Sequence, residues 1–322
     1  MAVKTYETGS KASGNARMTF PFKIMDIMER DPNVWYVFSD AATPTNSTGM
    51  ILAKFPDRAV EVGIAEQNMI GTAAGLALAG KRVFCMAFGP FLSVRAADQI
   101  QLDLAYNHLP VCVIGTHGGL TSGGGPTHYT LLDSAVMSAI PRMVMEVPAD
   151  ANQGLRAIDA FLDMDGPMYI RLARGNEPLV YENDDYDFNV GKGIMVKEGT
   201  DVTIIANGIG VHNSLLAAEI LEKQGISVQL VDMHTVSPLD IDLAVRCAQK
   251  TGTVITVEDH GIVGGLGSVV ATALMEAGVS CKFKRLGAPS DDFAALGTPE
   301  MLYKHYGYDG PGIAGAVTEL LK

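Results

Sequence analysis

The chain has 322 residues, of which 48% are hydrophobic and 19% are charged, and its formal net charge is −12. Such a chain is long enough for two domains and apolar enough to bury a large core, which excludes an intrinsically disordered protein. The acidic balance, with no basic stripe, argues against nucleic acid or anionic membrane as a partner. No apolar stretch reaches the roughly 18 residues of a membrane span.

Short apolar runs that are typical of strands alternate with segments that are typical of helices. Residues 1–17 precede them, and we interpret this polar stretch as a flexible or partner-docked arm. This alternation predicts a mostly parallel sheet with helices on both faces. The predicted elements are helix 20–30, strand 34–38, strand 60–63, helix 66–80, strand 83–87, helix 92–107, strand 110–115, helix 130–138, strand 143–147, helix 151–163 and strand 168–172.

An acidic segment that is poor in apolar residues, 181–187, interrupts the pattern, and we interpret it as a linker. The sequence therefore predicts an α/β fold of two doubly wound domains, with bounds at 1–188 and 189–322. In the second domain the predicted elements are strand 202–206, helix 213–224, strand 227–231, helix 238–250, strand 253–257, helix 266–277 and a strand near 281–285.

Four cysteines, none of them in a CxxC pair, favour free thiols over disulfides or a metal site. Cys85 and Cys112 lie in apolar runs, where a cysteine behaves as a small buried hydrophobic residue. Because the first residues are polar, no signal peptide is expected. A reducing, cytoplasmic location is the prediction.

The most informative stretch places a carboxylate, that of Glu66, at the start of a helix directly after a strand. Taken alone, a glutamate there is explained by its favourable interaction with the helix dipole. The string Gly63-Ile64-Ala65-Glu66-Gln67, however, resembles the pyrimidine-binding domain of thiamin-diphosphate enzymes, and of transketolases in particular. The resemblance implies that Glu66 is the catalytic acid that contacts N1′ of the cofactor's aminopyrimidine, with Gln67 as a further cofactor contact.

A second string, Phe88-Gly89-Pro90-Phe91, resembles the aromatic pair that walls the aminopyrimidine in transketolases. The resemblance implies that Phe88 and Phe91 bind the cofactor. A third aromatic residue often follows three positions later in the family. That position is Val94 here, so we expect the stacking to be less complete.

Two histidines on a Gly-rich loop, His117 and His128, resemble the paired substrate histidines of transketolases. The resemblance implies that His117 meets the phosphate or an equivalent anion of the substrate. It implies a catalytic role for His128, which would hydrogen-bond near the reacting carbonyl. Arg174 and Arg17 match the family's anion-binding arginines, and their forked guanidinium groups suit a terminal oxyanion.

The segment 40–45 is similar to the family's Asp-x-Thr-Pro-Ser segment, with one additional residue. The resemblance places Asp40 near the thiazolium of the cofactor. It gives Thr45 a contact with the substrate anion. The resemblance continues beyond residue 189 into the family's C-terminal domain, which supports assembly more than chemistry, so we assign no site residue there.

The family's metal motif, Gly-Asp-Gly followed by an asparagine, is missing from the sequence, since Tyr308-Asp309-Gly310 lies in the wrong domain. We therefore predict no metal ligand in this chain and expect the Mg²⁺ of thiamin diphosphate to be held by another polypeptide. The resemblance implies a separate N-terminal subunit that carries the diphosphate-binding domain. An A2B2 heterotetramer is the expected assembly.

The predicted activity is transfer of a two-carbon ketol unit from a ketose to an aldose phosphate such as glyceraldehyde 3-phosphate. Ordinary transketolases carry a Glu-Asp pair before the second histidine, and the loop 122–128 has no acid there. The family's aspartate contacts the C2 hydroxyl of the sugar, so its loss changes discrimination. We therefore expect a modified ketose such as apulose 4-phosphate or 6-deoxy-6-sulfofructose.

Three alternatives stay open. The beta subunit of a 2-oxo acid dehydrogenase has a similar Gly-Ile-Ala-Glu-Gln string. The string Arg95-Ala96-Ala97-Asp98-Gln99 resembles 1-deoxyxylulose-5-phosphate synthase. A catalytically inactive regulatory subunit, or a scaffold for the partner chain, is the third alternative.

Overall fold

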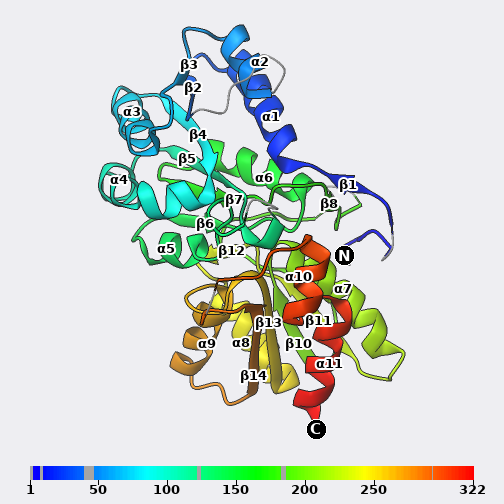
Figure 1. The fold of residues 1–322 in the computed structure, drawn as a ribbon. Helices are drawn as coiled ribbons and strands as arrows, with labels where there is room; N and C mark the ends of the chain where they lie inside the picture. The colour runs from blue at the N-terminus through cyan, green and yellow to red at the C-terminus, as the bar shows by residue number, and fades with distance from the viewer. Residues whose placement is uncertain (1–2, 8–9, 40–46, 122–124, 183–185, 292) are drawn as a thin grey trace.

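The computed structural model describes residues 3–7, 10–39, 47–121, 125–182, 186–291 and 293–322. The chain forms two sheets, one above the other in Figure 1, with helices on both faces of each. The predicted α/β fold of two doubly wound units is therefore confirmed. Within the described part of the chain, no helix is long and apolar enough to cross a membrane.

The first sheet has seven strands in the order β12-β6-β7-β5-β4-β2-β3, parallel except for β12. Its central strands are apolar almost throughout, because helices cover both faces. The strands are Val34–Phe38 (β2), Ala59–Glu61 (β3), Arg82–Phe88 (β4), Val111–Thr116 (β5), Val144–Glu146 (β6), Met168–Arg171 (β7) and Thr235–Ser237 (β12).

Two hydrophobic clusters lie against this sheet, one on each face. Helices α1 (Ala16–Arg30) and α6 (Ala151–Leu162) cover one face, where Phe20 and Phe161 are fully buried. Helices α3 (Glu66–Leu78) and α5 (Asp133–Ala139) cover the other. A short helix, α2, spans Ser47–Lys54.

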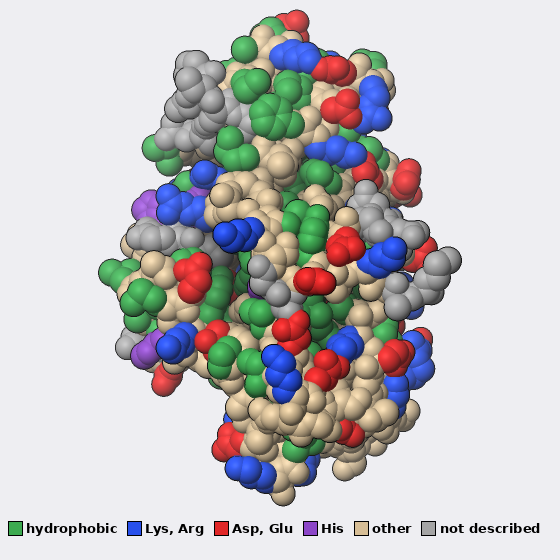
Figure 2. Space-filling model, turned by 90° about the vertical axis from the view of Figure 1, so that its right-hand side faces the viewer, with side chains coloured by type: hydrophobic (Ala, Val, Ile, Leu, Met, Phe, Trp, Pro, Cys, Tyr) green, Lys and Arg blue, Asp and Glu red, His purple; other side chains and the backbone are tan. Residues whose placement is uncertain are grey.

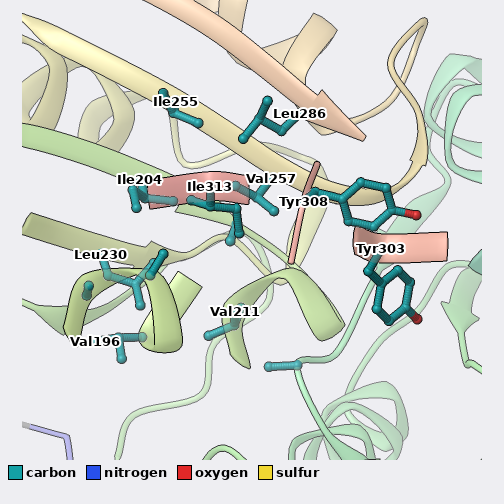
Figure 3. Packing of buried hydrophobic residues seen from close by; sticks show 14 of the residues in the cluster. Val196, Ile204, Val211, Leu230, Ile255, Val257, Leu286, Tyr303, Tyr308 and Ile313 are labelled. Atoms are coloured by element: carbon teal, nitrogen blue, oxygen red, sulfur yellow. The ribbon is translucent and has the colours of Figure 1, made fainter. Parts of the chain in front are cut away.

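The second sheet has five strands in the order β14-β13-β10-β11-β9, with only the edge strand β9 antiparallel. Figure 3 shows part of the cluster on one of its faces, where Tyr303 and Tyr308 lie side by side at one end. The elements are Ile194–Lys197 (β9), Val202–Ala206 (β10), Ile209–Glu222 (α7), Val228–Asp232 (β11), Ile241–Thr251 (α8), Thr253–Gly261 (β13), Leu266–Glu276 (α9), Lys282–Ala288 (β14), Pro299–Tyr306 (α10) and Gly310–Leu321 (α11).

Strand β12 joins the two units, because it follows β11 in the chain but pairs with β6 of the first sheet. Around it, His234 contacts the carboxylate of Glu146 at 2.9 Å, and the hydroxyl of Thr235 donates to the same carboxylate at 2.6 Å. The ring of Phe188 stacks on His234 at 4.4 Å. All three polar side chains are buried, so this junction is part of the core.

Several elements differ from the prediction. The interpretation of residues 1–17 as a flexible or partner-docked arm is wrong for its last part, because Ser13–Gly14 (β1) pairs with Glu177–Pro178 (β8) and α1 begins at Ala16. The expected helix 92–107 is divided into two π-helical segments, Phe91–Arg95 and Ile100–Tyr106, with the short helix α4 (Ala97–Gln99) between them.

Asn15 has two contacts that set where α1 begins. Its side-chain oxygen accepts from the backbone N–H of Met18, and its amide donates to Asn176 at 3.1 Å. Substitution of Asn15 by alanine is expected to lower the free energy of unfolding by about 1 kcal/mol, because the N-cap is lost. Asn15→Asp keeps the capping oxygen and is expected to stay near wild type. Urea titration measures both, and equal losses would mean that the Asn176 contact, not the cap, is what matters.

Candidate active site

The predicted site residues gather at one edge of the first sheet, where the carboxyl ends of adjacent parallel strands meet. Phe88 ends β4, His117 follows β5, and Arg174 lies just past β7. Strand β5 pairs with β4 on one side and β7 on the other. Ligands of open α/β sheets bind at this edge.

Glu66 is the first residue of α3, and its side chain is only 3% exposed. One carboxylate oxygen, Oε2, accepts a hydrogen bond from the guanidinium of Arg95 at 2.7 Å. Among the residues that the structure describes, the other oxygen, Oε1, has only the Ser39 hydroxyl at 3.5 Å, the limit of a hydrogen bond. Glu66 is therefore a buried carboxylate with one oxygen engaged and one available to a ligand.

Phe88 and Phe91 form what we call the aromatic wall. Their rings stack with centroids 5.7 Å apart and planes 15° apart. His117 lies against Phe88 at 3.9 Å, and His128 lies edge-on to Phe91 at 5.9 Å. Val94, at the position where the family often has a third aromatic residue, is 65% exposed and is not part of the wall. A flat apolar surface with two imidazoles beside it suits a heteroaromatic ring.

Each histidine is oriented by the threonine that precedes it. The Thr116 hydroxyl lies 2.9 Å from Nδ1 of His117, and the Thr127 hydroxyl lies 2.8 Å from Nδ1 of His128. His117 has a φ of 64°, a left-handed conformation that is uncommon for a non-glycine residue. Such backbone conformations cluster at functional sites. His117 is buried, whereas His128 is exposed.

Two arginines add positive charge beside His117. The pairing of β1 with β8 brings the first turn of α1, with Arg17, to the loop that carries Arg174. Within the part of the chain that the structure describes, Nε of Arg17 is buried without a hydrogen-bond partner. Burial, followed by the charge of Arg174, lowers the pKa of Arg17. A buried, unsatisfied donor of one cation beside a second cation indicates a site for an anion.

The pKa of His117 gives a test of this anion site. Burial, followed by the charges of Arg17 and Arg174, lowers this pKa from 6.5 to about 4, so the imidazole is neutral at pH 7. Inorganic phosphate is expected to raise the pKa, because the bound anion offsets both cations. A titration of the histidine ring protons by NMR, with and without phosphate, measures the change.

His212 is the internal control for that titration, since burial alone lowers its pKa. Its signal should not respond to phosphate. A His117 signal that titrates near 6.5 without phosphate, or that moves no more than His212 when phosphate is added, would contradict the anion site.

Asp259, at the end of β13 in the second unit, contacts the loop that follows β5 and carries His117, which we call the histidine loop. This carboxylate accepts from the backbone N–H of Leu120 at 3.0 and 3.2 Å. It also accepts from the hydroxyls of Tyr303 and Tyr308 at 3.1 and 3.0 Å. Gly119 has a φ of 76°, and a Cβ there would collide with the Asp259 carboxylate, so only glycine fits.

Arg171, at the end of β7, ties the same loop to α5. Its Nε donates to both oxygens of Asp133 at 2.9 and 3.0 Å, and its Nη2 donates to the carbonyl of Asp259 at 2.8 Å. All three residues are buried. No site residue was predicted in the second unit. The signal was the run of charged or titratable residues 258–260 at the end of a strand that otherwise has none.

The structure thus brings seven of the predicted residues to one sheet edge. Gln67 is exposed next to Glu66 on α3. Asp40 and Thr45 lie outside the described residues. The seven residues are Glu66, Phe88, Phe91, His117, His128, Arg17 and Arg174.

This arrangement fits one end of thiamin diphosphate. The open Oε1 of Glu66 suits a ring nitrogen, and the aromatic wall suits the face of an aminopyrimidine. For a metal ion, no group of three or more His, Cys, Asp or Glu side chains within metal-binding reach occurs among the residues that the structure describes.

Family models define the class of protein. Residues 17–178 match the pyrimidine binding domain of transketolase, and residues 191–313 match the C-terminal domain of transketolase. The chain therefore belongs to the transketolase family.

Several curated relatives align with nearly the whole of this chain and over nearly their own full length. A putative transketolase C-terminal section of Methanocaldococcus jannaschii is 38% identical, over 93% of this chain and 94% of that protein. An apulose-4-phosphate transketolase subunit of Phocaeicola vulgatus is 36% identical, over 95% of this chain and 97% of that protein. The 6-deoxy-6-sulfo-D-fructose transketolase subunit SqwH of Clostridium sp. is 37% identical, over 94% of each chain.

A solved structure gives the same result. A split gene transketolase, described as an inactive beta4 tetramer, superposes with a TM-score of 0.86 at 35% identity, over 95% of this chain and 98% of that chain. The match to the C-terminal half of a split transketolase, predicted from the sequence, is thereby confirmed.

Proposed function

We propose that this chain is the cofactor-activating subunit of a split transketolase that moves a two-carbon ketol unit from a ketose to an aldose phosphate. The observation that supports this most directly is the convergence of Glu66, the aromatic wall and the His117–Arg17–Arg174 anion site at one sheet edge. When bound, thiamin diphosphate supplies the carbon nucleophile of the reaction.

In this proposal the residues of the chain bind, orient and move protons. Oε1 of Glu66 holds the proton at N1′ of the aminopyrimidine, and the aromatic wall fixes the ring. His128 hydrogen-bonds near the reacting carbonyl. His117, neutral at pH 7 because its pKa is about 4, donates a hydrogen bond to the substrate anion, and the two arginines supply the charge.

The donor we propose is a modified ketose with a terminal phosphate or sulfonate. Two relatives are named for apulose 4-phosphate and 6-deoxy-6-sulfo-D-fructose, which both end in an oxyanion. The missing acidic pair in the loop 122–128 supports a departure from ordinary pentose phosphates. Glyceraldehyde 3-phosphate is the proposed acceptor.

We propose further that a separate N-terminal subunit carries the diphosphate and Mg²⁺ sites, in an A2B2 heterotetramer. Support comes from two relatives that are named as transketolase subunits and from the inactive state of the split-gene tetramer made of beta chains. A cytoplasmic location is also part of the proposal, since all four cysteines are free thiols.

The decisive experiment is co-expression of this chain with an N-terminal transketolase subunit. Ketol transfer to glyceraldehyde 3-phosphate is measured with Mg²⁺ and thiamin diphosphate, from fructose 6-phosphate, xylulose 5-phosphate, apulose 4-phosphate and 6-deoxy-6-sulfofructose. Each subunit alone is the control. We expect transfer only when both are present. An assembled pair that transfers nothing but decarboxylates pyruvate would overturn the proposal.

A deoxyxylulose-phosphate-synthase type of reaction is the second candidate. The synthase of Syntrophotalea carbinolica is 34% identical over 99% of this chain but only 50% of its own length. The observation that favours it is the contact of Arg95 with Glu66, because Arg95 belongs to the string that resembles this class of enzyme. Pyruvate with glyceraldehyde 3-phosphate tests it, and capture by a lipoyl domain tests the 2-oxo acid dehydrogenase alternative.

A further inference from the structure

Arg95 is a residue that the proposed mechanism does not use, although it lies against the proposed catalytic acid. Its Nη1 is 2.7 Å from Oε2 of Glu66. The carboxylate is 3% exposed, whereas the arginine side chain is 45% exposed. Ion pairs between two exposed side chains contribute little to stability, because water and salt screen both charges. Here the carboxylate is buried, so solvent screens this ion pair less.

The contact leaves the two oxygens of Glu66 unequal. Oε2 has a short, charge-assisted hydrogen bond, which is among the stronger polar contacts in proteins. Within the described part of the chain, Oε1 has only the distant hydroxyl of Ser39. The arginine therefore decides which oxygen is turned toward a ligand, and it fixes the plane of the carboxylate.

A second contact holds Arg95 itself. Its guanidinium lies 4.4 Å from the centroid of the Phe91 ring, a cation–π geometry. Both residues belong to the π-helical turn Phe91–Arg95, which ends with the N–H of Ala96 bonded to the carbonyl of Phe91. Single π-helical turns are rare and occur frequently at functional sites.

We propose that Arg95 is a positioning residue for the proposed cofactor site: it couples the acid Glu66 to the aromatic wall, so that the carboxylate and the Phe91 ring are presented in one fixed geometry. The family often has a third aromatic residue beside this pair, and Val94 stands at that position here. In this chain the guanidinium of Arg95, and not the side chain of Val94, packs on the aromatic wall. This inference rests on the proposed function, since it concerns the same site.

The alternative is a surface ion pair with no part in the chemistry. The two ideas differ in how Arg95 and Glu66 depend on each other. A positioning residue acts through Glu66, so its removal matters only while Glu66 is present. If Arg95 had an independent role, the fold-loss of kcat in the double variant would be the product of the losses in the two single variants.

The experiment uses the complex of this chain with its N-terminal subunit, with Mg²⁺. Calorimetry gives the dissociation constant of thiamin diphosphate, and ketol transfer at saturating cofactor gives kcat and KM. Arg95→Gln is expected to weaken cofactor binding and to lower kcat, each by about tenfold, the value of one charge-assisted contact. KM for the ketose should not change.

Three further variants sharpen the test. Arg95→Lys should recover part of the loss, because it keeps the charge but not the flat guanidinium. In the Glu66→Gln background, Arg95→Gln should lower kcat no further. Arg246→Gln, at an exposed position on α8, is the control and should resemble wild type.

The results separate the two proposals. An Arg95→Gln enzyme that equals the Arg246→Gln control, or whose loss multiplies with that of Glu66→Gln, overturns the role of Arg95. If the wild-type complex transfers no ketol unit, the proposed function fails, but calorimetry still decides the role of Arg95 through non-additive losses of cofactor affinity. A wild-type complex that binds no thiamin diphosphate overturns both.

Discussion

Substitution of Glu66 by glutamine is expected to lower kcat for ketol transfer by about 10²–10⁴-fold, the range of a lost acid–base contribution. Glutamine has nearly the same shape, so the buried site at the start of α3 should stay packed. What is lost is the carboxylate at Oε1 and the charge that pairs with Arg95. The loss is therefore expected in turnover more than in folding.

Steady-state kinetics of the assembled enzyme at saturating thiamin diphosphate checks this. Glu61→Gln is a matched control, because Glu61 lies on the preceding strand and is exposed. Circular dichroism and co-purification with the N-terminal subunit establish that the variant folds and assembles. A Glu66→Gln enzyme within a few-fold of wild type would remove Glu66 from the chemistry and leave the chain with a supporting role.

Substitution of Asp133 by asparagine is expected to reduce the free energy of unfolding by about 3–5 kcal/mol, the usual effect of leaving a buried charge without its partner. Asp133 is fully buried and accepts two hydrogen bonds from Arg171. The unpaired guanidinium would stay beneath the histidine loop. Ketol transfer should therefore fall as well, because that loop carries His117.

Urea titration of the chain measures the stability. Asp26→Asn removes an ion pair between exposed side chains on α1 and should change the free energy of unfolding by less than about 1 kcal/mol. The double variant Asp133→Asn, Arg171→Met should be less unstable than the sum of the single variants. Additive losses would show that the pair is not coupled.

The alternation of strands and helices could be predicted from the sequence because parallel strands in a covered sheet are continuous apolar runs. Strand β2 is an example, since its five residues read Val-Trp-Tyr-Val-Phe. Helix α2 and strand β9 were not predicted, and neither was the pairing of β1 with β8. That pairing joins residues more than 160 positions apart, and no local pattern encodes it.

The candidate site could be predicted where a short string carries its own resemblance, as around Glu66 and His117. The contributions of Arg95 and Asp259 could not be predicted in the same way. Arg95 reaches Glu66 from the π-helical turn Phe91–Arg95, whereas the sequence predicted a regular helix there. Asp259 reaches the histidine loop across 139 positions of chain, through packing of one unit on the other.

The face drawn in Figure 2 has acidic and basic side chains interspersed, with no extended basic stripe on that face. The positive charge of the candidate anion site comes instead from two neighbouring arginines. Arg17 and Arg174 are close enough to lower the pKa of His117, although the chain as a whole carries a net charge of −12. A small group of cations can thus capture an anion on an acidic protein.

Because strand β12 completes the first sheet, the first unit cannot be separated from the second without exposing strand β6. A fragment that stops at residue 188 would end before Thr235–Ser237, and β6 would become an open sheet edge. Glu146 would lose both of its buried partners and face solvent or another molecule. Exposed sheet edges pair with strands of other molecules, so the fragment should aggregate during purification. If the peptide 233–238 is added in trans, it should pair with β6 and keep the fragment monodisperse.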